Sequence, residues 1–157
     1  MNKYRRSENP ASSIELRKMG FSLIELMVVI AIISILGLIA FPQYQKFSAK
    51  AKLAAAFADL TGGKAGAMAW VAEHGDFHGT DAALLGLPDR TERCSSIRTR
   101  PAILGGIEIT CTLVPDPMYS LSGTEAVLVL SFDVNDESWN CWTAIPFTDL
   151  LPPACRL

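Results

Sequence analysis

Charged side chains are almost missing between Phe21 and Phe41, where Glu25 is the single exception. A run of this length and apolarity suffices to cross the hydrocarbon layer of a bilayer, which argues against a chain that is soluble throughout. The segment after the run, "FPQYQKF", lacks the A-x-A pattern of an ordinary secretory cleavage site. The sequence therefore predicts a membrane anchor that is not an ordinary signal peptide.

Motifs for metal binding and catalysis are also lacking. The cysteines form no C-x-x-C pair, no D-x-D-x-D-G loop occurs, and "LTGGKAG" does not have the spacing of a phosphate loop. No nucleophile elbow is recognisable. The run "EHGDFHGTD" is better explained as a solvated loop than as a metal site; it contains Glu73, His74, Asp76, His78 and Asp81. The sequence predicts no enzyme, no cofactor and no metal.

The charges that are present divide the chain. The first twenty residues carry a net charge of +3 and the remaining residues a net charge of −5. A basic flank before an apolar run predicts a cytoplasmic amino end and an exported carboxyl portion. The acidic exported portion, from Gln43 onward, argues weakly against nucleic acid as the main partner. With 157 residues, the chain has room for an anchor and one small domain.

All four cysteines lie in the portion expected to be exported, and an even number there indicates two disulfides. Three pairings are possible. We favour Cys94–Cys111 and Cys141–Cys155, because each closes a loop of about 15 residues, worth about 3 kcal/mol in the chain-entropy model.

A long helix is predicted from about residue 21 to residue 73. Pro42 removes one backbone bond and can kink the helix, but the following "QYQKFSAKAKLAAAFADL" again favours helix. Gly62 and Gly63 weaken the middle, and Gly75 is a natural stop. The second half is expected to bury one stripe, formed by Leu53, Phe57, Leu60, Lys64, Met68 and Val71.

After a loop in residues 74–90, the apolar period changes to two. Residues 106–114, 126–134 and 140–147 are candidate strands, and their short connections imply antiparallel neighbours. Three or four strands covered on one face by the second half of the helix make an α+β domain. Pro152 and Pro153 exclude the tail from a central strand. Trp70 and Trp139 are expected to pack in the core or on the sheet.

The stretch "KMG" followed by "FSLIELMVVIAIISILGLIAFP" closely resembles the amino-terminal signature of type IV pilins and the related pseudopilins. The resemblance runs from Lys18 to about Phe47, although Ser34 stands where many relatives have glycine. It implies a leader of residues 1–20, an assembly and transmembrane helix of residues 21–42, and a globular domain of residues 43–157. The pattern "WNCW…LPPAC" also resembles the disulfide-closed loop of many pilins.

The resemblance implies a specific life cycle. A prepilin peptidase in the inner membrane would cut between Gly20 and Phe21 and methylate the new amine of Phe21. Assembly machinery would then build subunits into an extracellular helical filament, with the apolar helices in its core. Other pilin subunits, the peptidase, the machinery, and a host surface or DNA are the implied partners. Adhesion, twitching motility and DNA uptake are the implied functions, and Pro42 would loosen the helix during assembly.

Glu25 has a physical rationale in this setting. The cleaved chain carries a cation on Phe21, at a helix end that already favours an anion. In a filament core of low dielectric, a neighbour's amine would offset the desolvation of the Glu25 carboxylate. The alternative is a glutamate that extends toward the lipid headgroups. We expect Glu25 to determine the stagger between subunits.

The loop of residues 142–154 is expected to expose apolar side chains held by the second disulfide. Such a surface would contact either a host surface or the next subunit, and the sequence does not separate these roles. Its members include Trp142, Pro146, Phe147, Leu150 and Leu151.

Two rival interpretations remain open. A pseudopilin of a type II secretion system would use the same helix in a short periplasmic piston, although the cysteines favour a pilin. A monomeric, single-pass periplasmic binding or adhesive module would never polymerise. Retention of residues 1–20 in the mature protein would favour this last interpretation.

Overall fold

The computed structural model describes residues 20–156, except residues 76, 80, 103–105 and 121–123. Residues 1–19 of the predicted leader, and Asp76 of the acidic run, lie outside the described residues. The chain divides into two compact units, Met1–Leu38 and Ile39–Leu157, which are described separately. The second unit has the α+β architecture predicted from the sequence.

Helix α1 covers Leu23–Thr61 and is followed by α2 at Lys64–His74, so the predicted helix is interrupted at Gly62 and Gly63. The interruption has a packing cause. A Cβ on Gly63 would lie 2.6 Å from Leu87 Cδ1, and a Cβ on Gly66 would lie 2.3 Å from the backbone oxygen of Leu85. The glycine-rich segment therefore permits close packing of α2 on the 3₁₀ helix η1, Ala82–Leu85.

The predicted stop at Gly75 is confirmed. Its φ of 82° places it in the left-handed region that favours glycine, and its N–H donates to the Val71 carbonyl. This bond satisfies one of the carbonyl groups left free at the end of α2.

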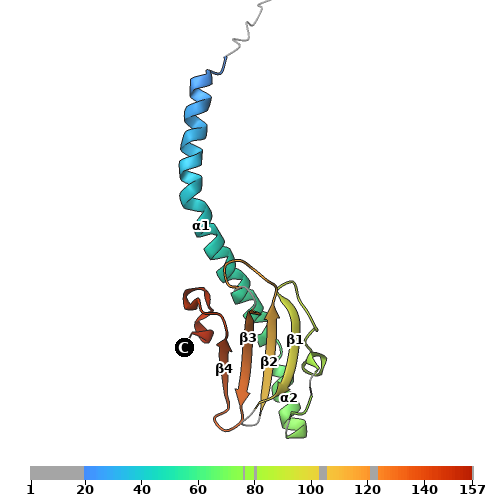
Figure 1. The fold of residues 1–157 in the computed structure, drawn as a ribbon. Helices are drawn as coiled ribbons and strands as arrows, with labels where there is room; N and C mark the ends of the chain where they lie inside the picture. Colours follow the sequence, from blue (N-terminus) through green and yellow to red (C-terminus); the bar gives the residue numbers. More distant parts are fainter. Residues whose placement is uncertain (1–19, 76, 80, 103–105, 121–123, 157) are drawn as a thin grey trace, which may run out of the picture. The chain divides into compact units, whose positions relative to one another are not determined.

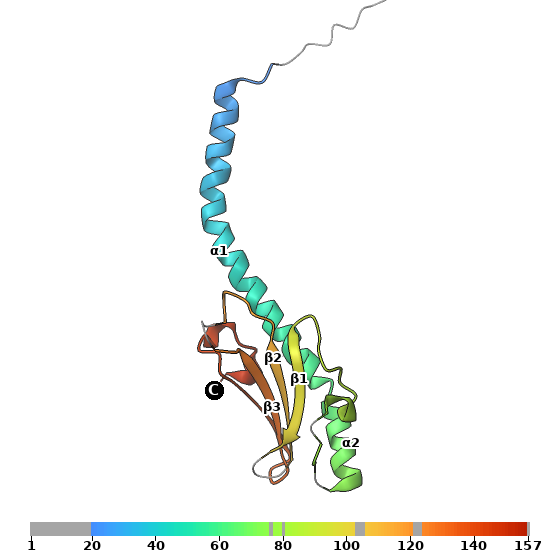
Figure 2. The same ribbon diagram turned by 45° about the vertical axis from the view of Figure 1, so that its right-hand side comes forward.

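Four antiparallel strands form one sheet in the order β1-β2-β3-β4, and the second half of α1 packs on one face of it (Figures 1 and 2). The strands are β1 at Cys94–Pro101, β2 at Ile107–Leu113, β3 at Val127–Asp133 and β4 at Ser138–Thr143. The register pairs Ile109 with Leu130, and Leu130 with Cys141, so apolar side chains align across the buried face.

The core joins the helices to this sheet, but the predicted helical stripe is wrong in part. Leu53 and Leu60 are fully buried as expected, whereas Met68 is 45% exposed and Ala67 takes the buried place beside it. The buried positions keep a spacing of three and four through the interruption, and the predicted stripe leaves this series at Lys64 and Met68; the buried series is Leu53, Ala56, Leu60, Gly63 and Ala67. The buried small residues of α1 and α2, which bring the helices close to the sheet, are Ala49, Ala56 and Ala67.

Both disulfides join neighbouring segments of the sheet side of the domain, by which we mean the four strands, their connections and the tail. Cys94 and Cys111 link β1 to β2 with Cα atoms 5.4 Å apart, and Cys141 and Cys155 link β4 to the tail with Cα atoms 4.6 Å apart. The tail forms two short 3₁₀ helices, η2 at Thr148–Leu150 and η3 at Pro153–Cys155, and no strand. This agrees with the exclusion of Pro152 and Pro153 from the sheet.

Candidate functional site

The first half of α1 is apolar on every side, and no other described residue of its own unit covers it. Large apolar side chains from Phe21 to Phe41 are all more than 40% exposed. Among the described residues, one helical segment is long and apolar enough to cross a membrane, and it begins at Leu23. A surface of this size requires lipid or protein around it.

Glu25 lies in the first turn of this helix, and its side chain is exposed. The free N–H groups of a first helical turn favour a carboxylate at this position. Ser34, the other polar side chain in the run beyond the first turn, donates its hydroxyl to the Ile30 carbonyl at 2.7 Å. The serine is thus satisfied within the helix, and Glu25 is left as the polar group that requires an external partner.

The peptide bond between Gly20 and Phe21 precedes the helix. Gly20, Phe21 and Ser22 have no helical assignment, and the Phe21 side chain is 71% exposed. A protease must bind its substrate in an extended form, so a bond before the helix is better suited to cleavage than a bond inside it. Cleavage at this bond, which the sequence predicts, would place the new amine four residues before Glu25.

Pro42 lies inside α1, which remains helical around it. Because proline has no N–H, the carbonyl of Leu38, four residues earlier, has no partner in the helical ladder. The division between the two compact units falls directly after Leu38. The backbone bond missing at Pro42 therefore coincides with this boundary.

The carboxyl-terminal loop is only partly the apolar surface that the sequence predicts. Trp142 and Phe147 are 38% and 41% exposed, and Pro146 is exposed as well. Leu150 and Leu151 are buried in the domain core, so their assignment to a contact surface is wrong. They instead fix the tail on the domain, and of the five predicted contact residues only Trp142, Pro146 and Phe147 are exposed.

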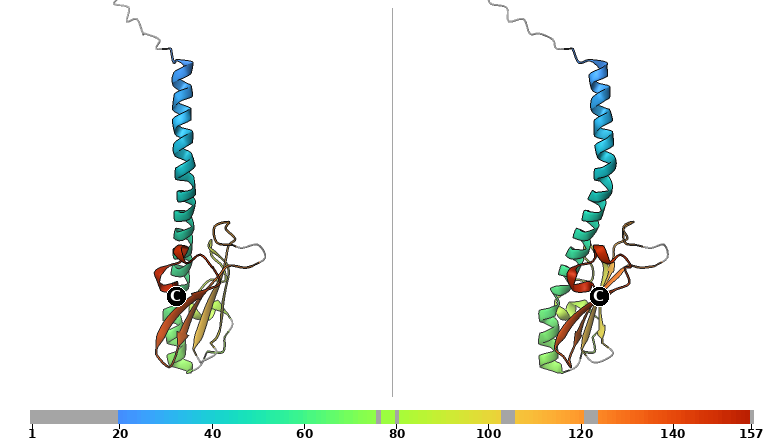
Figure 3. Two further views of the ribbon diagram at one scale, coloured as in Figure 1. Left: turned by 60° about the vertical axis from the view of Figure 1, so that its left-hand side comes forward. Right: turned by 90° about the vertical axis from the view of Figure 1, so that its left-hand side faces the viewer.

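The tail lies beside α1 (Figure 3), where Lys46 and Asp149 form an ion pair at 2.5 Å. The hydrogen bond from Lys46 lowers the pKa of the Asp149 carboxyl. Because both side chains are about half exposed, water and salt screen this pair. The apolar contacts of Leu150 and Leu151 are the larger contribution to holding the tail.

A second ion pair joins α1 to the connection between β2 and β3. Lys52 Nζ donates to Asp116 Oδ2 at 2.5 Å, and Asp116 Oδ1 accepts the Met118 N–H at 2.9 Å. Burial opposes ionisation of Asp116, but these two hydrogen bonds outweigh it and lower the pKa of the carboxyl. The same hydrogen bond raises the pKa of Lys52.

These shifts predict a pH-dependent contribution to stability. A lowered pKa for Asp116 means that the contribution is present above its ordinary pKa near 3.8 and is lost as the pH falls further. We expect Lys52→Met to lower the free energy of unfolding at pH 7 by less than about 1 kcal/mol, because Lys52 is half exposed. Urea denaturation of both proteins should show this difference vanishing near pH 2. Lys50→Met, with the same change in net charge, should show a smaller difference at pH 7.

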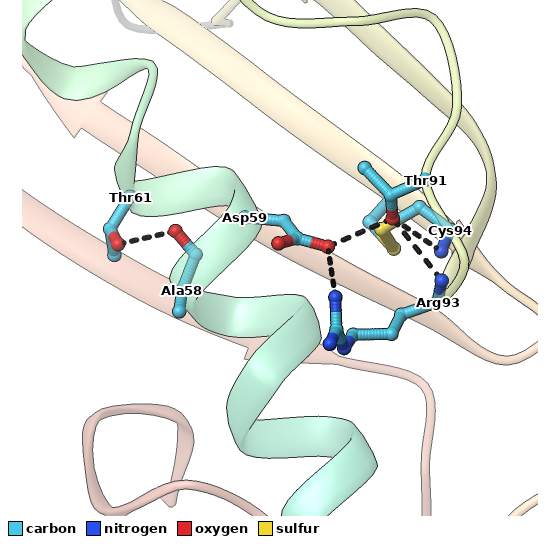
Figure 4. A network of polar contacts seen from close by, with 7 residues as sticks. Ala58, Asp59, Thr61, Thr91, Arg93 and Cys94 are labelled. Atoms are coloured by element: carbon cyan, nitrogen blue, oxygen red, sulfur yellow. Dashed lines mark hydrogen bonds and ion pairs between the residues drawn. A yellow bond between two sulfur atoms is a disulfide. The ribbon is translucent and has the colours of Figure 1, made fainter.

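A third polar network joins α1 to the segment before β1 (Figure 4). Asp59 Oδ2 accepts the Thr91 hydroxyl at 2.8 Å and lies 3.7 Å from the Arg93 guanidinium. Thr91 Oγ1 in turn accepts the backbone N–H groups of Arg93 and Cys94. This network fixes the start of β1 next to the first disulfide. Thr91, Arg93 and Cys94 lie 32 or more positions after Asp59 along the chain, so no local pattern signals the network.

The run "EHGDFHGTD" is a structural segment where it is described. The His74 ring stacks on Trp70 with ring centres 4.3 Å apart, and Asp81 accepts the Ala83 N–H at the start of η1. No group of three metal-ligating side chains comes together among the described residues. Trp70 also meets Phe77 edge-on, and Lys64 Nζ lies 5.2 Å from the centre of the Trp139 ring. Both tryptophans pack on the domain as expected.

Comparisons with known proteins agree with the anatomy of both units. Residues 49–156 match the family described as Pilin (bacterial filament), and residues 18–41 match the prokaryotic N-terminal methylation motif. The chain is 34% identical to the fimbrial protein EcpC of Eikenella corrodens, over 87% of this chain and 90% of that protein. It is 33% identical to a fimbrial protein of Pseudomonas aeruginosa, over 78% and 83% of the two chains. A type IV major pilin protein, PilE1, of Neisseria gonorrhoeae is 43% identical over 36% of this chain and 34% of its own.

Proposed function

The chain belongs to the pilin family of bacterial filament proteins, and from this premise we propose that it is a structural subunit, major or minor, of a type IV pilus. The observation that carries the proposal is Glu25, a single carboxylate in the first turn of a helix whose apolar surface is otherwise uncovered. A helix of this kind is suited first to a bilayer and then to the interior of a polymer of identical helices.

Processing at the amino end supplies the partner for Glu25 in this proposal. A prepilin peptidase cuts between Gly20 and Phe21 and methylates the amine of Phe21, which keeps its positive charge. The match to the N-terminal methylation motif over residues 18–41 supports this step. In the polymer, the amine of one subunit forms an ion pair with Glu25 of its neighbour. The pairing offsets the desolvation cost that each buried charge would carry alone.

Location follows from the same steps. Before assembly, the subunit spans the inner membrane once, with residues 1–20 on the cytoplasmic side and residues 43–157 exported. After assembly by machinery in the inner membrane, it is part of an extracellular pilus. Formation of disulfides in an exported domain supports this orientation, because the four cysteines all lie in that domain and are all paired.

The proposed role is structural and not enzymatic. The protein contributes a surface to a filament, and adhesion and twitching motility are the functions to which such a filament would be applied. DNA uptake is a further use of the same machinery. Trp142, Pro146 and Phe147 are exposed in the carboxyl-terminal loop and would contact a host surface or the next subunit.

A pseudopilin of a type II secretion system is the second candidate function. The names of the relatives favour the pilus, because those relatives are fimbrial proteins and a type IV major pilin. The disulfide that closes residues 141–155 is a second feature in favour of the pilin. A cell-surface location of the assembled protein separates the two candidates.

Mass spectrometry of filaments sheared from the cell surface tests the proposal. We expect abundant protein that begins at Phe21, carries one methyl group on its amine and contains both disulfides. The control is the membrane fraction of a strain without the peptidase, where the chain should begin before Gly20. Recovery of an uncut, monomeric membrane protein from the unmodified strain would refute the proposal.

A further inference from the structure

We propose that a polar cavity beside strand β1 binds a carboxylated sugar. The cavity has a volume of about 480 Å³, within the range of about 300–1,000 Å³ that is typical of small-molecule sites. It belongs entirely to the globular unit and contains no part of the assembly helix. Its lining consists of Asp81, Ala82, Asp89, Arg90, Ser95, Ser96, Ile97 and Arg98.

The walls of this cavity are held in place by the fold. Ile97 and Ala82 are buried and belong to the domain core. The Ile97 N–H donates to the Asp89 carbonyl at 2.6 Å, which ties the loop before β1 to the strand. The Asp81 carboxylate accepts the Ala83 N–H and fixes the start of η1. The Thr91 network with Asp59 holds the other end of the same loop. A cavity with fixed walls loses little conformational entropy when a ligand binds.

Two guanidinium groups in this cavity have no acidic partner among the described residues. Arg90 and Arg98 are exposed and form none of the ion pairs of the domain, whereas Arg93 is paired with Asp59 and Arg100 with Glu108. An unpaired guanidinium presents a planar fork of donors that matches a carboxylate in a bidentate manner. The cavity therefore offers donors for an anionic group.

The other groups that line the cavity limit which kind of anion can bind. Asp81 and Asp89 balance the formal charge of the two arginines, so an anion would be held by directed guanidinium hydrogen bonds and not by net charge. A phosphate dianion would bring a second negative charge into a cavity that already holds two carboxylates. Asp89 and the Ser96 hydroxyl accept hydrogen bonds, which suits the hydroxyl groups of a sugar. No aromatic side chain lines the cavity, and an apolar ligand would have little surface to contact. One carboxylate on a ring with several hydroxyl groups satisfies all of these conditions.

This inference goes beyond the proposed structural role, because it assigns a ligand class to a site outside the assembly helix and the carboxyl-terminal loop. Binding at this cavity requires the folded domain only. It is therefore measurable on purified subunits that have not polymerised, and its failure would leave the proposed filament role untouched.

The test is a titration of the full chain, uniformly labelled with ¹⁵N, in detergent micelles. The probes are the methyl glycosides of glucuronic, galacturonic and N-acetylneuraminic acid, with neutral methyl glucoside and inorganic phosphate as comparisons. We expect saturable shifts of the Ser96 and Ile97 amide signals with at least one acidic sugar. Methyl glucoside and phosphate should bind at least about tenfold more weakly, because neither supplies both the carboxylate and the hydroxyl groups.

Arg98→Gln and Arg100→Gln form a matched pair of variants. Both arginines are exposed on β1 and project from the same face of the strand, but only Arg98 lines the cavity. We expect Arg98→Gln to weaken binding of the acidic sugar about tenfold or more, and Arg100→Gln to leave it unchanged. Equal effects of the two variants, equal binding of methyl glucoside or phosphate, or no saturable shift with any of the three acidic sugars would overturn the proposal.

Discussion

Replacement of Glu25 by alanine is expected to leave the chain folded and inserted in the membrane, but to abolish filaments on the cell surface. In the proposed polymer, the variant would leave the charged amine of Phe21 without its partner in a medium of low dielectric. Breaking a buried ion pair by removing one partner typically costs about 3 to 5 kcal/mol. That cost lowers each association constant by a factor of roughly 10² to 10⁴, and it recurs at every subunit added.

The measurement is the yield of sheared filaments, compared with the amount of subunit in the membrane fraction. Glu25→Gln keeps the shape of the side chain but removes its negative charge, so this variant should also form no surface filaments. Ser34→Ala is the matched control on the same helix: the Ser34 hydroxyl already bonds to the Ile30 carbonyl, so filaments should form normally. Wild-type yields from Glu25→Ala would show that the glutamate is not an assembly determinant.

Gly66→Ala is expected to be the most disruptive methyl addition in the described helices of the globular unit. The added Cβ would lie 2.3 Å from the backbone oxygen of Leu85, and backbone cannot rotate away as a side chain can. Helix propensity alone would stabilise the variant by about 1 kcal/mol. Overpacking typically costs about 1 to 3 kcal/mol, and a contact with backbone places this site at the upper end of that range. After the gain in helix propensity is subtracted, we expect net destabilisation of about 2 kcal/mol and a fall in Tm of roughly 8 °C.

Thermal unfolding of the full chain in detergent, followed by circular dichroism, measures this effect. Gly62→Ala is the matched control, because its Cβ would meet the Asp59 carbonyl oxygen at 3.3 Å and no atom nearer. We expect its Tm to change much less. If Gly66→Ala melted at or above the wild-type temperature, the close contact between α2 and η1 would not exist in solution.

The amphipathic helix and strands β2 and β3 could be predicted because each carries its own periodic pattern. Strand β4 has no such alternation; the sequence predicts it at residues 140–147, and it lies at Ser138–Thr143. In β2, the inward residues Ile107, Ile109 and Cys111 alternate with polar neighbours, and the burial of the strand follows the same alternation. The interruption of the helix at Gly62 was harder to predict. It depends on contacts with Leu85 and Leu87, which lie more than twenty positions further along the chain.

Strand β1 escaped prediction because its pattern is polar. Only Cys94, Ile97 and Thr99 are buried in "CSSIRTRP", and one of the three is itself a polar residue. The strand forms because β2 supplies a partner for it and because the disulfide to Cys111 fixes its first residue. A tertiary context of this kind overrides local β propensity.

The functional residues divide in a similar way. Gly20, Phe21 and Glu25 could be proposed as processing and assembly residues from the sequence, because the motif that contains them is one continuous segment, residues 18–41. The members of the carboxyl-terminal loop could be listed, but the directions of their side chains could not, since Leu150 and Leu151 turn inward at the end of the 3₁₀ helix η2. The cavity beside β1 left no local signal, because η1, a loop and a strand each contribute to it.

The ion pairs of α1 have a mechanical consequence. Lys46, Lys52 and Asp59 bond to three separate segments of the sheet side: the tail, the β2–β3 connection and the segment before β1. Both disulfides lie within the sheet side, so none anchors it covalently to α1. Tension applied along α1 would therefore act on the sheet as a shear force across the core. The three ion pairs would share this force, and each of them can break and re-form while the other two remain intact.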